Sequence, residues 1–327
     1  MTGREDSGAL RRAVRDQAVA CGAAEEGCAR AQLVATELAT NLLQHAVPGG
    51  CIFTRTLPAA GIELIAVDGG PGIADPAAAI AGHGAVAQGL GCGLAAVRRA
   101  SSQFDLHTEL GQGTTVLSVI DLIPANRQGD RPTRRSVAAV SVGIAEPCGD
   151  AWAVSQDNGE LAVAVVDGLG HGPAASAAAD VAVAQFAATP TDLMGFVSRA
   201  NAAMRDTRGA AVTVCRLRPG LGRLEYVTVG NVNGRVLGTS AQENLITYRG
   251  TLGMYVSPPA TRLLTCPWLA GSTLVLWTDG LSDRVAALAP DAELLRHDPA
   301  VIAATLHRDH GRSYDDATVV VVRNPGA

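Results

Sequence analysis

Lysine is missing from this 327-residue sequence, so all 26 of its Lys and Arg positions are arginines. The absence excludes a P-loop, which needs a phosphate-binding lysine, and a protein kinase fold, which needs a lysine on one strand. Nucleotide chemistry would therefore depend on metal ions, backbone amides or arginine. Aromatic residues are also scarce, at 3%, and the formal net charge is -5. Since no basic cluster with interleaved aromatics occurs, the sequence predicts no nucleic-acid partner.

Long apolar runs and closely paired cysteines are absent too. No run reaches the roughly 20 apolar residues that a membrane helix needs, and the polar residues 1–15 lack the apolar core of a signal peptide. The seven cysteines include no Cys-x-x-Cys pair, which favours reduced, buried thiols. We therefore expect a cytoplasmic protein with no membrane partner.

The spacing of apolar residues predicts an α+β protein of two domains. Helical spacing occurs at 9–20, 29–46, 94–100, 174–188 and 191–205. Strand-like runs occur at 51–57, 62–67, 104–108, 114–120, 137–144, 151–155, 161–166, 211–217, 224–229, 236–237, 274–277 and 318–322. The polar stretch 125–135 has no periodicity and predicts a linker. We therefore predict one domain over 1–124 and another over 136–327.

Acidic residues in the second half stand at the ends of apolar strands. Asp150 precedes one strand, Asp167 and Asp279 follow two others, and Asp315 precedes the last. Because strand ends are rigid and can meet at one edge of a core, these carboxylates can converge, and Mg²⁺ and Mn²⁺ prefer such oxygen ligands. An Asp-Gly pair taken alone is more typical of a turn. Four such positions together favour a metal site.

The order of these motifs resembles the SpoIIE-like branch of the PP2C phosphatase family. The matching blocks are Gly149-Asp150, Asp167-Gly168-x-Gly170-His171-Gly172, Thr278-Asp279-Gly280 and Asp315-Asp316-x-Thr318. The resemblance covers 136–327 and implies a PP2C-like αββα sandwich with two or more Mg²⁺ or Mn²⁺ ions. By this resemblance, the metal ligands and catalytic residues are Asp150, Asp167, Asp279 and Asp315, and the backbone carbonyl of Gly168 is a further metal ligand.

Two further residues and one segment of the second half lie outside this ligand set. Asp316 stands where the wider family often has Asn, so it is a secondary candidate. We expect His171, which lies between two glycines, to shape its turn rather than to act as a general acid. The segment Gly230–Gly234 resembles a loop of RsbX-type members to which we attach no chemistry.

Polar residues on the predicted helix 29–46 lie on one face. Glu37, Asn41 and His45 are spaced by four. Such a stripe is usually the solvated side of a helix, but glycine-rich or polar blocks follow it along the chain. These blocks are Asp68-Gly69-Gly70-Pro71-Gly72-Ile73, Gly89-Leu90-Gly91-Cys92-Gly93-Leu94 and Gly113-Thr114-Thr115. Glycines let backbone amides approach a polyphosphate, toward which a helix beginning near Leu94 would direct its N-terminal dipole.

This ordered set, over 7–123, resembles the GHKL (histidine-kinase-like) ATP-binding domain, a Bergerat α/β sandwich. The nearest resemblance within it is to the RsbT/RsbW-like serine kinases and anti-sigma factors. It implies ATP with Mg²⁺ as the cofactor, Asn41 as the Mg²⁺ ligand and Glu37 as the catalytic base. By the same resemblance the nucleotide-binding residues are Asp68, Gly70, Gly72, Gly91, Gly93 and Thr114.

Together the two resemblances imply a metal-dependent protein serine/threonine phosphatase with an ATP-binding regulatory domain, which could also be a serine kinase. Its substrates would be phosphorylated STAS-domain antagonist proteins of a partner-switching or stressosome pathway, with a sigma-factor regulator as a further partner. Three alternatives stay open. The kinase could be the main activity with the phosphatase half as a scaffold, the first half could be an anti-sigma-type binding module, or the substrate could be a small phosphate ester.

Overall fold

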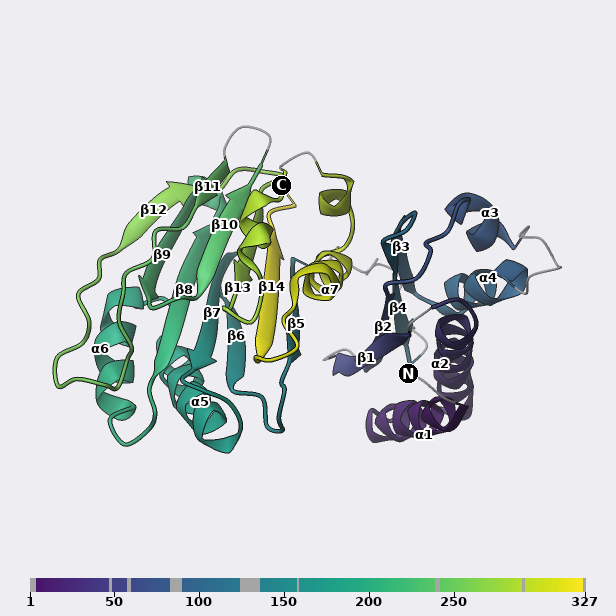
Figure 1. Ribbon diagram of the computed structural model, residues 1–327, viewed down its shortest axis with the longest axis horizontal. Helices are drawn as coiled ribbons and strands as arrows, with labels where there is room; N and C mark the ends of the chain where they lie inside the picture. Colours follow the sequence, from purple (N-terminus) through teal and green to yellow (C-terminus); the bar gives the residue numbers. More distant parts are fainter. Residues whose placement is uncertain are drawn as a thin grey trace. The chain divides into compact units, whose positions relative to one another are not determined.

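Described residues of the computed structural model are 4–46, 49–57, 60–82, 90–123, 136–157, 159–238, 242–289 and 292–325. The chain separates into two units, Met1–Arg134 and Arg135–Ala327 (Figure 1). The predicted linker, 125–135, lies outside the described residues.

An antiparallel sheet with the strand order β1-β2-β4-β3 forms one layer of the first unit. The elements of this unit are α1 (Arg4–Ala20), α2 (Glu25–His45), β1 (Gly50–Leu57), β2 (Gly61–Asp68), α3 (Pro76–Ala81), α4 (Leu90–Ala100), β3 (Gln103–Glu109) and β4 (Gly113–Asp121). Because side chains alternate along a strand, Ile62, Leu64 and Ala66 of β2 share one face and join the buried core that α1, α2 and α4 cover. The α/β prediction for this half is confirmed.

The glycine-rich block before Leu94 is helical, which corrects one expectation. Helix α4 begins at Leu90, so Gly91 and Gly93 lie inside the helix rather than in a loop before it, whereas Gly89 lies outside the described residues. A Cβ atom on Gly93 would stand 2.9 Å from Oε2 of Glu37. Glycine at this position therefore permits the close approach of α4 to α2.

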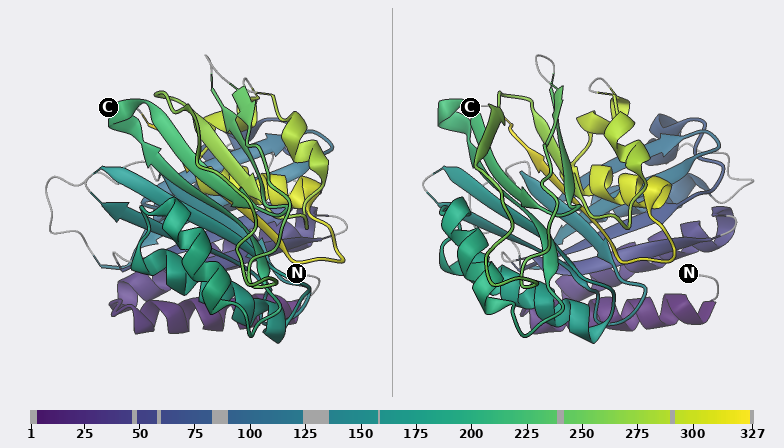
Figure 2. Two further views of the ribbon diagram at one scale, coloured as in Figure 1. Left: turned by 90° about the vertical axis from the view of Figure 1, so that its left-hand side faces the viewer. Right: turned by 60° about the vertical axis from the view of Figure 1, so that its left-hand side comes forward.

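Two five-stranded antiparallel sheets pack face to face in the second unit (Figure 2). Their strand orders are β11-β10-β13-β14-β5 and β12-β9-β8-β7-β6. The strands are β5 (Val137–Val142), β6 (Asp150–Asp157), β7 (Glu160–Gly168), β8 (Ala210–Arg218), β9 (Arg223–Val229), β10 (Asn233–Leu237), β11 (Gln242–Asn244), β12 (Leu264–Pro267), β13 (Thr273–Trp277) and β14 (Ala317–Arg323).

Helices cover the outer face of each sheet in the second unit. Helices α5 (Pro173–Ala188) and α6 (Leu193–Ala203) pack on the sheet that contains β7, and α7 (Pro299–His310) packs on β14 and β5. Short 3₁₀ turns occur at Pro219–Leu221, Asp283–Ala287 and Glu293–Arg296. The αββα sandwich that the resemblance implied is therefore confirmed.

Strand β7 shows how the sandwich positions its functional residues. Ala162, Ala164 and Val166 face α5 and α6, whereas Val163 and Val165 face the second sheet. By the same alternation, Asp167 follows on the side of Val163 and Val165 and lies between the two sheets.

Three elements of the second unit were missing from the sequence prediction. In α7 every residue from Pro299 to Leu306 is buried, and all of them except Thr305 are apolar, so this part of the sequence has no helical periodicity. Strand β11 is three residues long and exposed, and β12 ends in a proline.

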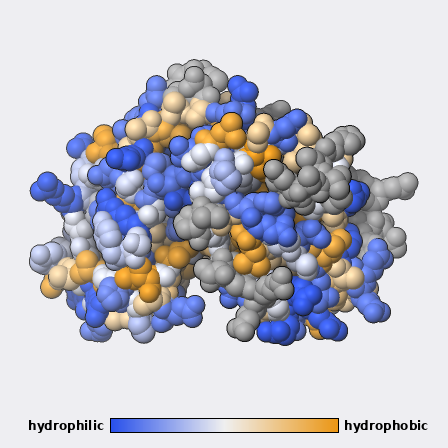
Figure 3. All heavy atoms as spheres, turned by 45° about the vertical axis from the view of Figure 1, so that its right-hand side comes forward, coloured by the Kyte–Doolittle hydropathy of each residue, from blue (hydrophilic) through white to orange (hydrophobic). Residues whose placement is uncertain are grey.

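The surface in view in Figure 3 is largely hydrophilic, with small, separate apolar areas. Among the described residues, no helix combines the length and apolar character needed to cross a membrane.

The strand ends of the second unit pack closely enough to require glycine at position 280. A Cβ atom there would lie 1.9 Å from the carbonyl oxygen of Asp316. We therefore expect Gly280→Ala to destabilise the protein by about 1–3 kcal/mol, because the backbone must shift to make room. The measurement is the urea midpoint of unfolding. Gly220→Ala is the matched control, since its Cβ would meet nothing within 4 Å; equal midpoints for both variants would contradict the prediction.

Candidate active site

Asp150 and Asp167 are neighbours because of the register between β6 and β7. The two residues stand directly opposite each other in this antiparallel pair, and side chains of directly opposite residues lie on the same face of a sheet. Asp150 is buried and Asp167 is half-buried. Strand pairing therefore brings two of the predicted carboxylates together.

The opposing sheet supplies the other two predicted acids. Asp279 follows β13 and Asp315 precedes β14, and these strands are direct neighbours. Thr278 joins the two sheets, because its hydroxyl donates to Oδ2 of Asp150 at 2.7 Å and accepts from the backbone N–H of Thr318 at 2.9 Å. The convergence of acids expected from the sequence is thus present at one edge of the sandwich.

Burial and mutual repulsion dominate the electrostatics of this cluster. Burial, followed by the charges of Asp150 and Asp279, raises the pKa of Asp167 to about 9. Burial also raises the pKa of Asp150 to about 7, although hydrogen bonds from Thr278 and Thr318 act in the opposite direction. The pKa of Asp315 is raised as well, again chiefly by burial. Such a cluster would be stabilised by bound cations.

Asp316 has a structural task. Its Oδ1 accepts from the backbone N–H of Ile144 at 2.8 Å, and its Oδ2 accepts from that of Gly149 at 2.7 Å. Both carboxylate oxygens are therefore occupied in fixing the segment that leads into β6. This explains why the adjacent Asp315, and not Asp316, belongs to the acidic cluster.

A cavity of about 500 Å³ opens on the cluster. Its lining includes Asp167, Asp279 and Asp315, and also Asn231, Asn233, Thr247, Arg249 and Thr251. Within the described residues, no three His, Cys, Asp or Glu side chains already converge on a single metal position. Mg²⁺ commonly keeps several waters and takes only one or two carboxylates, so the open oxygen set fits hydrated divalent ions.

Two polar residues of the cavity gain a role that the sequence did not assign. Nδ2 of Asn231 donates to Oδ2 of Asp279 at 2.5 Å, and Nδ2 of Asn233 donates to the carbonyl of Asn231 at 2.9 Å. The segment Gly230–Gly234 therefore orients one of the acids. His171 is exposed between Gly170 and Gly172, whose φ angles are +88° and +72°, as expected for a turn.

The metal-free protein should lose stability as the pH rises from about 4 toward 9. The pKa of Asp167 lies at about 9 in the folded state and at 3.8 ordinarily, so in this range the folded state keeps a proton that the unfolded state has released. Mn²⁺ should oppose this loss by neutralising the carboxylates. Asp167→Asn should flatten the pH dependence and abolish the rise in Tm with Mn²⁺.

Thermal unfolding with chelator and with Mn²⁺, across this pH range, checks the expectation. The exposed Asp206, which is outside the cavity lining, provides the matched control Asp206→Asn. An Asp167→Asn variant that keeps the wild-type pH slope and the wild-type response to Mn²⁺ would contradict it.

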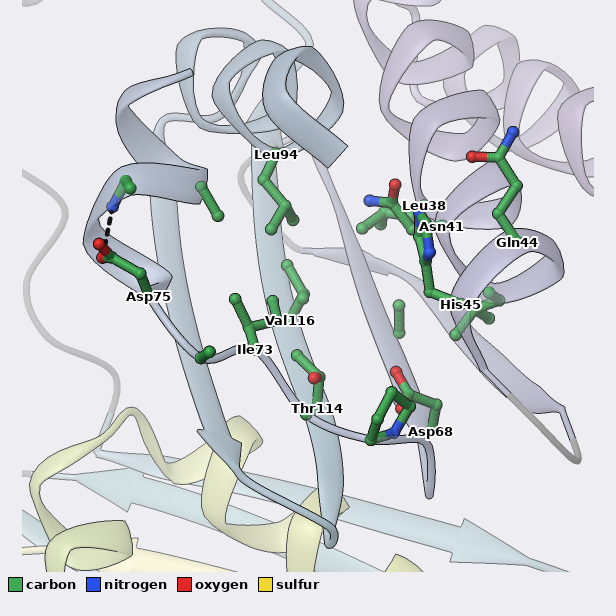
Figure 4. A pocket seen from close by; sticks show the side chains of 17 residues that line it. Leu38, Asn41, Gln44, His45, Asp68, Ile73, Asp75, Leu94, Thr114 and Val116 are labelled. Carbon is green, nitrogen blue, oxygen red and sulfur yellow. Dashed lines mark hydrogen bonds between the residues drawn. The ribbon is translucent and has the colours of Figure 1, made fainter. Parts of the chain in front are cut away.

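The first unit contains a separate cavity of about 680 Å³ (Figure 4). Asn41 and His45 of α2 line it, together with Asp68 at the end of β2 and Thr114 of β4. Gly72 also lines it, with φ of +74° and no room for a Cβ beside the carbonyl of Glu109. The sequence thus predicted a set of residues that do come together.

Other predicted residues of the first unit support the cavity rather than line it. The backbone N–H of Gly70 donates to Oδ1 of Asp68 at 2.8 Å. Gly93 and Glu37 pack against each other between α4 and α2, and Glu37 is not among the described residues that line the cavity. Gly91 lies in the first turn of α4.

Comparison with known proteins places the second unit in a family. Residues 157–325 match the model of Stage II sporulation protein E (SpoIIE). Over 140 residues the chain is 32% identical to the phosphoserine phosphatase RsbX of Bacillus subtilis (strain 168). The matched region covers 41% of this chain and 68% of RsbX.

Solved structures match the second unit in the same way. One of these structures comes from work on the bacterial stressosome, described as a modular system adapted to control secondary messenger signaling. It is 27% identical to this chain, with a TM-score of 0.53. The match covers 57% of this chain and 98% of that one. RsbX in complex with magnesium is 22% identical with a TM-score of 0.48, covering 57% and 92% respectively.

These matches concern the second unit, and the GHKL resemblance of the first unit stays a prediction. The SpoIIE model covers just over half of the chain, from within β6 to beyond β14, and the αββα sandwich is a PP2C-like phosphatase fold. The chain therefore belongs to the SpoIIE family, with a PP2C-type phosphatase domain as its second unit.

Proposed function

We propose that the second unit hydrolyses phosphoserine or phosphothreonine on a protein, with two or more Mg²⁺ or Mn²⁺ ions as cofactors. Asp150, Asp167, Asp279 and Asp315, with the backbone carbonyl of Gly168, would hold these ions. The observation that carries the proposal is the presence of three of these acids in the lining of one cavity. Bound divalent ions would supply a water of lowered pKa and neutralise the phosphoryl oxygens.

The protein's own residues would position this chemistry. Asn231 fixes one oxygen of Asp279, and Thr278 fixes one oxygen of Asp150. The carbonyl of Asp279 accepts from Nη1 of Arg312 at 2.8 Å, which holds the backbone of the same residue. Asp279 and Asp150 would therefore present their remaining oxygens in a fixed direction, as a preorganised site requires.

The relatives support a proposal for the substrate class. RsbX is a phosphoserine phosphatase, and the 27% identical structure comes from work on the stressosome. We propose that this chain acts on phosphorylated STAS-domain antagonist proteins of such a partner-switching pathway. A small phosphate ester is the alternative substrate, and it predicts faster turnover of sugar or nucleotide phosphates than of phosphoproteins.

Replacing Asp279 tests the phosphatase directly. We expect Asp279→Asn to lower the rate of Mn²⁺-dependent hydrolysis at least about 100-fold, because the acid that Asn231 orients loses its charge. The rates are measured on an aryl phosphate and on a phosphoserine STAS protein, with Mn²⁺ or with chelator. Asp206→Asn, on the exposed surface, should keep the wild-type rate. Equal turnover by wild type and Asp279→Asn would disprove this role for the cluster.

For the first unit we propose ATP binding with Mg²⁺, held by Asn41, as a regulatory function. Its cavity has the volume of a small-molecule site, and Nε2 of His45, which lines it, is buried and has no hydrogen-bond partner among the described residues. A ligand that offers a hydrogen bond would satisfy this nitrogen. The carboxylate of Glu37 packs against Gly93 of α4 and is absent from the described cavity lining. This position favours nucleotide binding over phosphoryl transfer as the function of the first unit. A sigma-factor regulator is a further candidate partner of this unit.

Asp68→Asn tests the ATP site. The resemblance gives Asp68 the role of recognising the adenine amino group, so we expect roughly 10-fold or greater loss of affinity for a fluorescent ATP analogue with Mg²⁺. The exposed Asp16 on α1 provides the control Asp16→Asn. Unchanged affinity in Asp68→Asn would rule out adenine recognition by this residue, and phosphotransfer that is lost in Glu37→Gln would favour the kinase alternative.

A further inference from the structure

The catalytic cavity has one basic residue on its wall. Among the described residues that line it, Asp167, Asp279 and Asp315 are acidic and Arg249 is the only cation. Metal ions would neutralise the acids, but a phosphate monoester brings further negative charge that also needs a partner. Arginine suits this task, because its planar guanidinium can donate two parallel hydrogen bonds to a phosphoryl group.

Arg249 is available for such a partner. Its side chain is exposed, and within the described part of the chain it forms no hydrogen bond or ion pair. Two other arginines of the second unit are engaged: Arg312 donates to the carbonyl of Asp279, and Nε of Arg262 donates to the hydroxyl of Tyr248. Arg249 shares a cavity of about 500 Å³ with the acids, and within the described residues it forms no ion pair with them.

The backbone on both sides of Arg249 is fixed. The N–H of Tyr248 donates to Oγ1 of Thr228 at 3.1 Å, and its carbonyl accepts from the N–H of Gly230 at 2.7 Å. Leu252 exchanges two backbone hydrogen bonds with Ala210, at 2.9 and 3.2 Å. The backbone that carries Arg249 is therefore held in place, so the entropy lost when the guanidinium binds a ligand comes mainly from the side chain.

We propose that Arg249 binds two non-bridging oxygens of the substrate's phosphoryl group in the cavity that it shares with Asp167, Asp279 and Asp315. This inference rests on the proposed phosphatase function and adds a substrate-binding residue to it. Inorganic phosphate, the product, has the same oxygens and would bind in the same way. A contact between Arg249 and a carboxylate of the protein substrate is the competing role, and it would leave small phosphate esters unaffected.

The experiment compares Arg249→Ala and Arg249→Lys with wild type. KM and kcat are measured on an aryl phosphate and on a phosphoserine protein, together with the inhibition constant of inorganic phosphate. We expect Arg249→Ala to raise both KM values and the inhibition constant roughly 10-fold or more, and Arg249→Lys to recover part of the loss, because it keeps the charge without the planar fork.

Arg262→Ala is the matched control. It removes an arginine of the same segment that contacts Tyr248 and is absent from the described cavity lining, so its inhibition constant should match wild type. The inference is overturned if Arg249→Ala leaves the aryl phosphate KM and the inhibition constant unchanged, even where the phosphoprotein KM rises. A rise of the same size in Arg262→Ala would also overturn it, because the effect would then come from the segment's fold.

Failure of the phosphatase proposal gives a different result, which is the absence of metal-dependent turnover in the wild type. Calorimetric titration with inorganic phosphate and Mn²⁺ then makes the same comparison without turnover. Equal phosphate affinity in wild type and Arg249→Ala would overturn the inference.

Discussion

Repulsion between neighbouring carboxylates is the constraint that the second unit must overcome. Asp150 and Asp167 are held side by side by strand register, and Asp279 reaches them from the other sheet. The pKa values of Asp150 and Asp167 are raised first by burial and then by the charges of neighbouring acids, and the raised values express the cost of this arrangement. The apolar core between the sheets, including Val163 and Val165, fixes the strands that carry the acids and so offsets that cost.

Adjacent acids serve different purposes because consecutive residues entering a strand point in opposite directions. Asp315 lines the cavity, whereas Asp316 accepts hydrogen bonds from the backbone N–H groups of Ile144 and Gly149. Gly280 must be small because it packs on the backbone of Asp316. One short segment thus supplies a candidate metal ligand and the bracing that keeps the neighbouring strand end in place.

The sequence predicted the acids and most strands, because buried strands have apolar runs whose ends are visible. It did not reveal Arg249 or the role of Asn231, since both lie in segments without periodicity. Only the structure shows that both line the cavity and that Asn231 donates a hydrogen bond to Asp279. Helix α7 was missed because it is buried on all sides over most of its length. Gly93 was predicted to lie in a phosphate-binding loop. The close contact between α4 and α2 also requires glycine at this position, so the residue type alone does not distinguish the two cases.

A kinase and a phosphatase on one chain would cancel each other if both acted on the same serine. The geometry of the first unit argues for a division of labour instead. Asn41, His45, Asp68 and Thr114 share a cavity, whereas the carboxylate of Glu37 packs against α4 outside its described lining. Glu37, the base that the GHKL resemblance implies, is thus absent from the described lining of this cavity. Under the proposed functions, the first unit would bind a nucleotide, the second unit would catalyse hydrolysis, and neither would reverse the other.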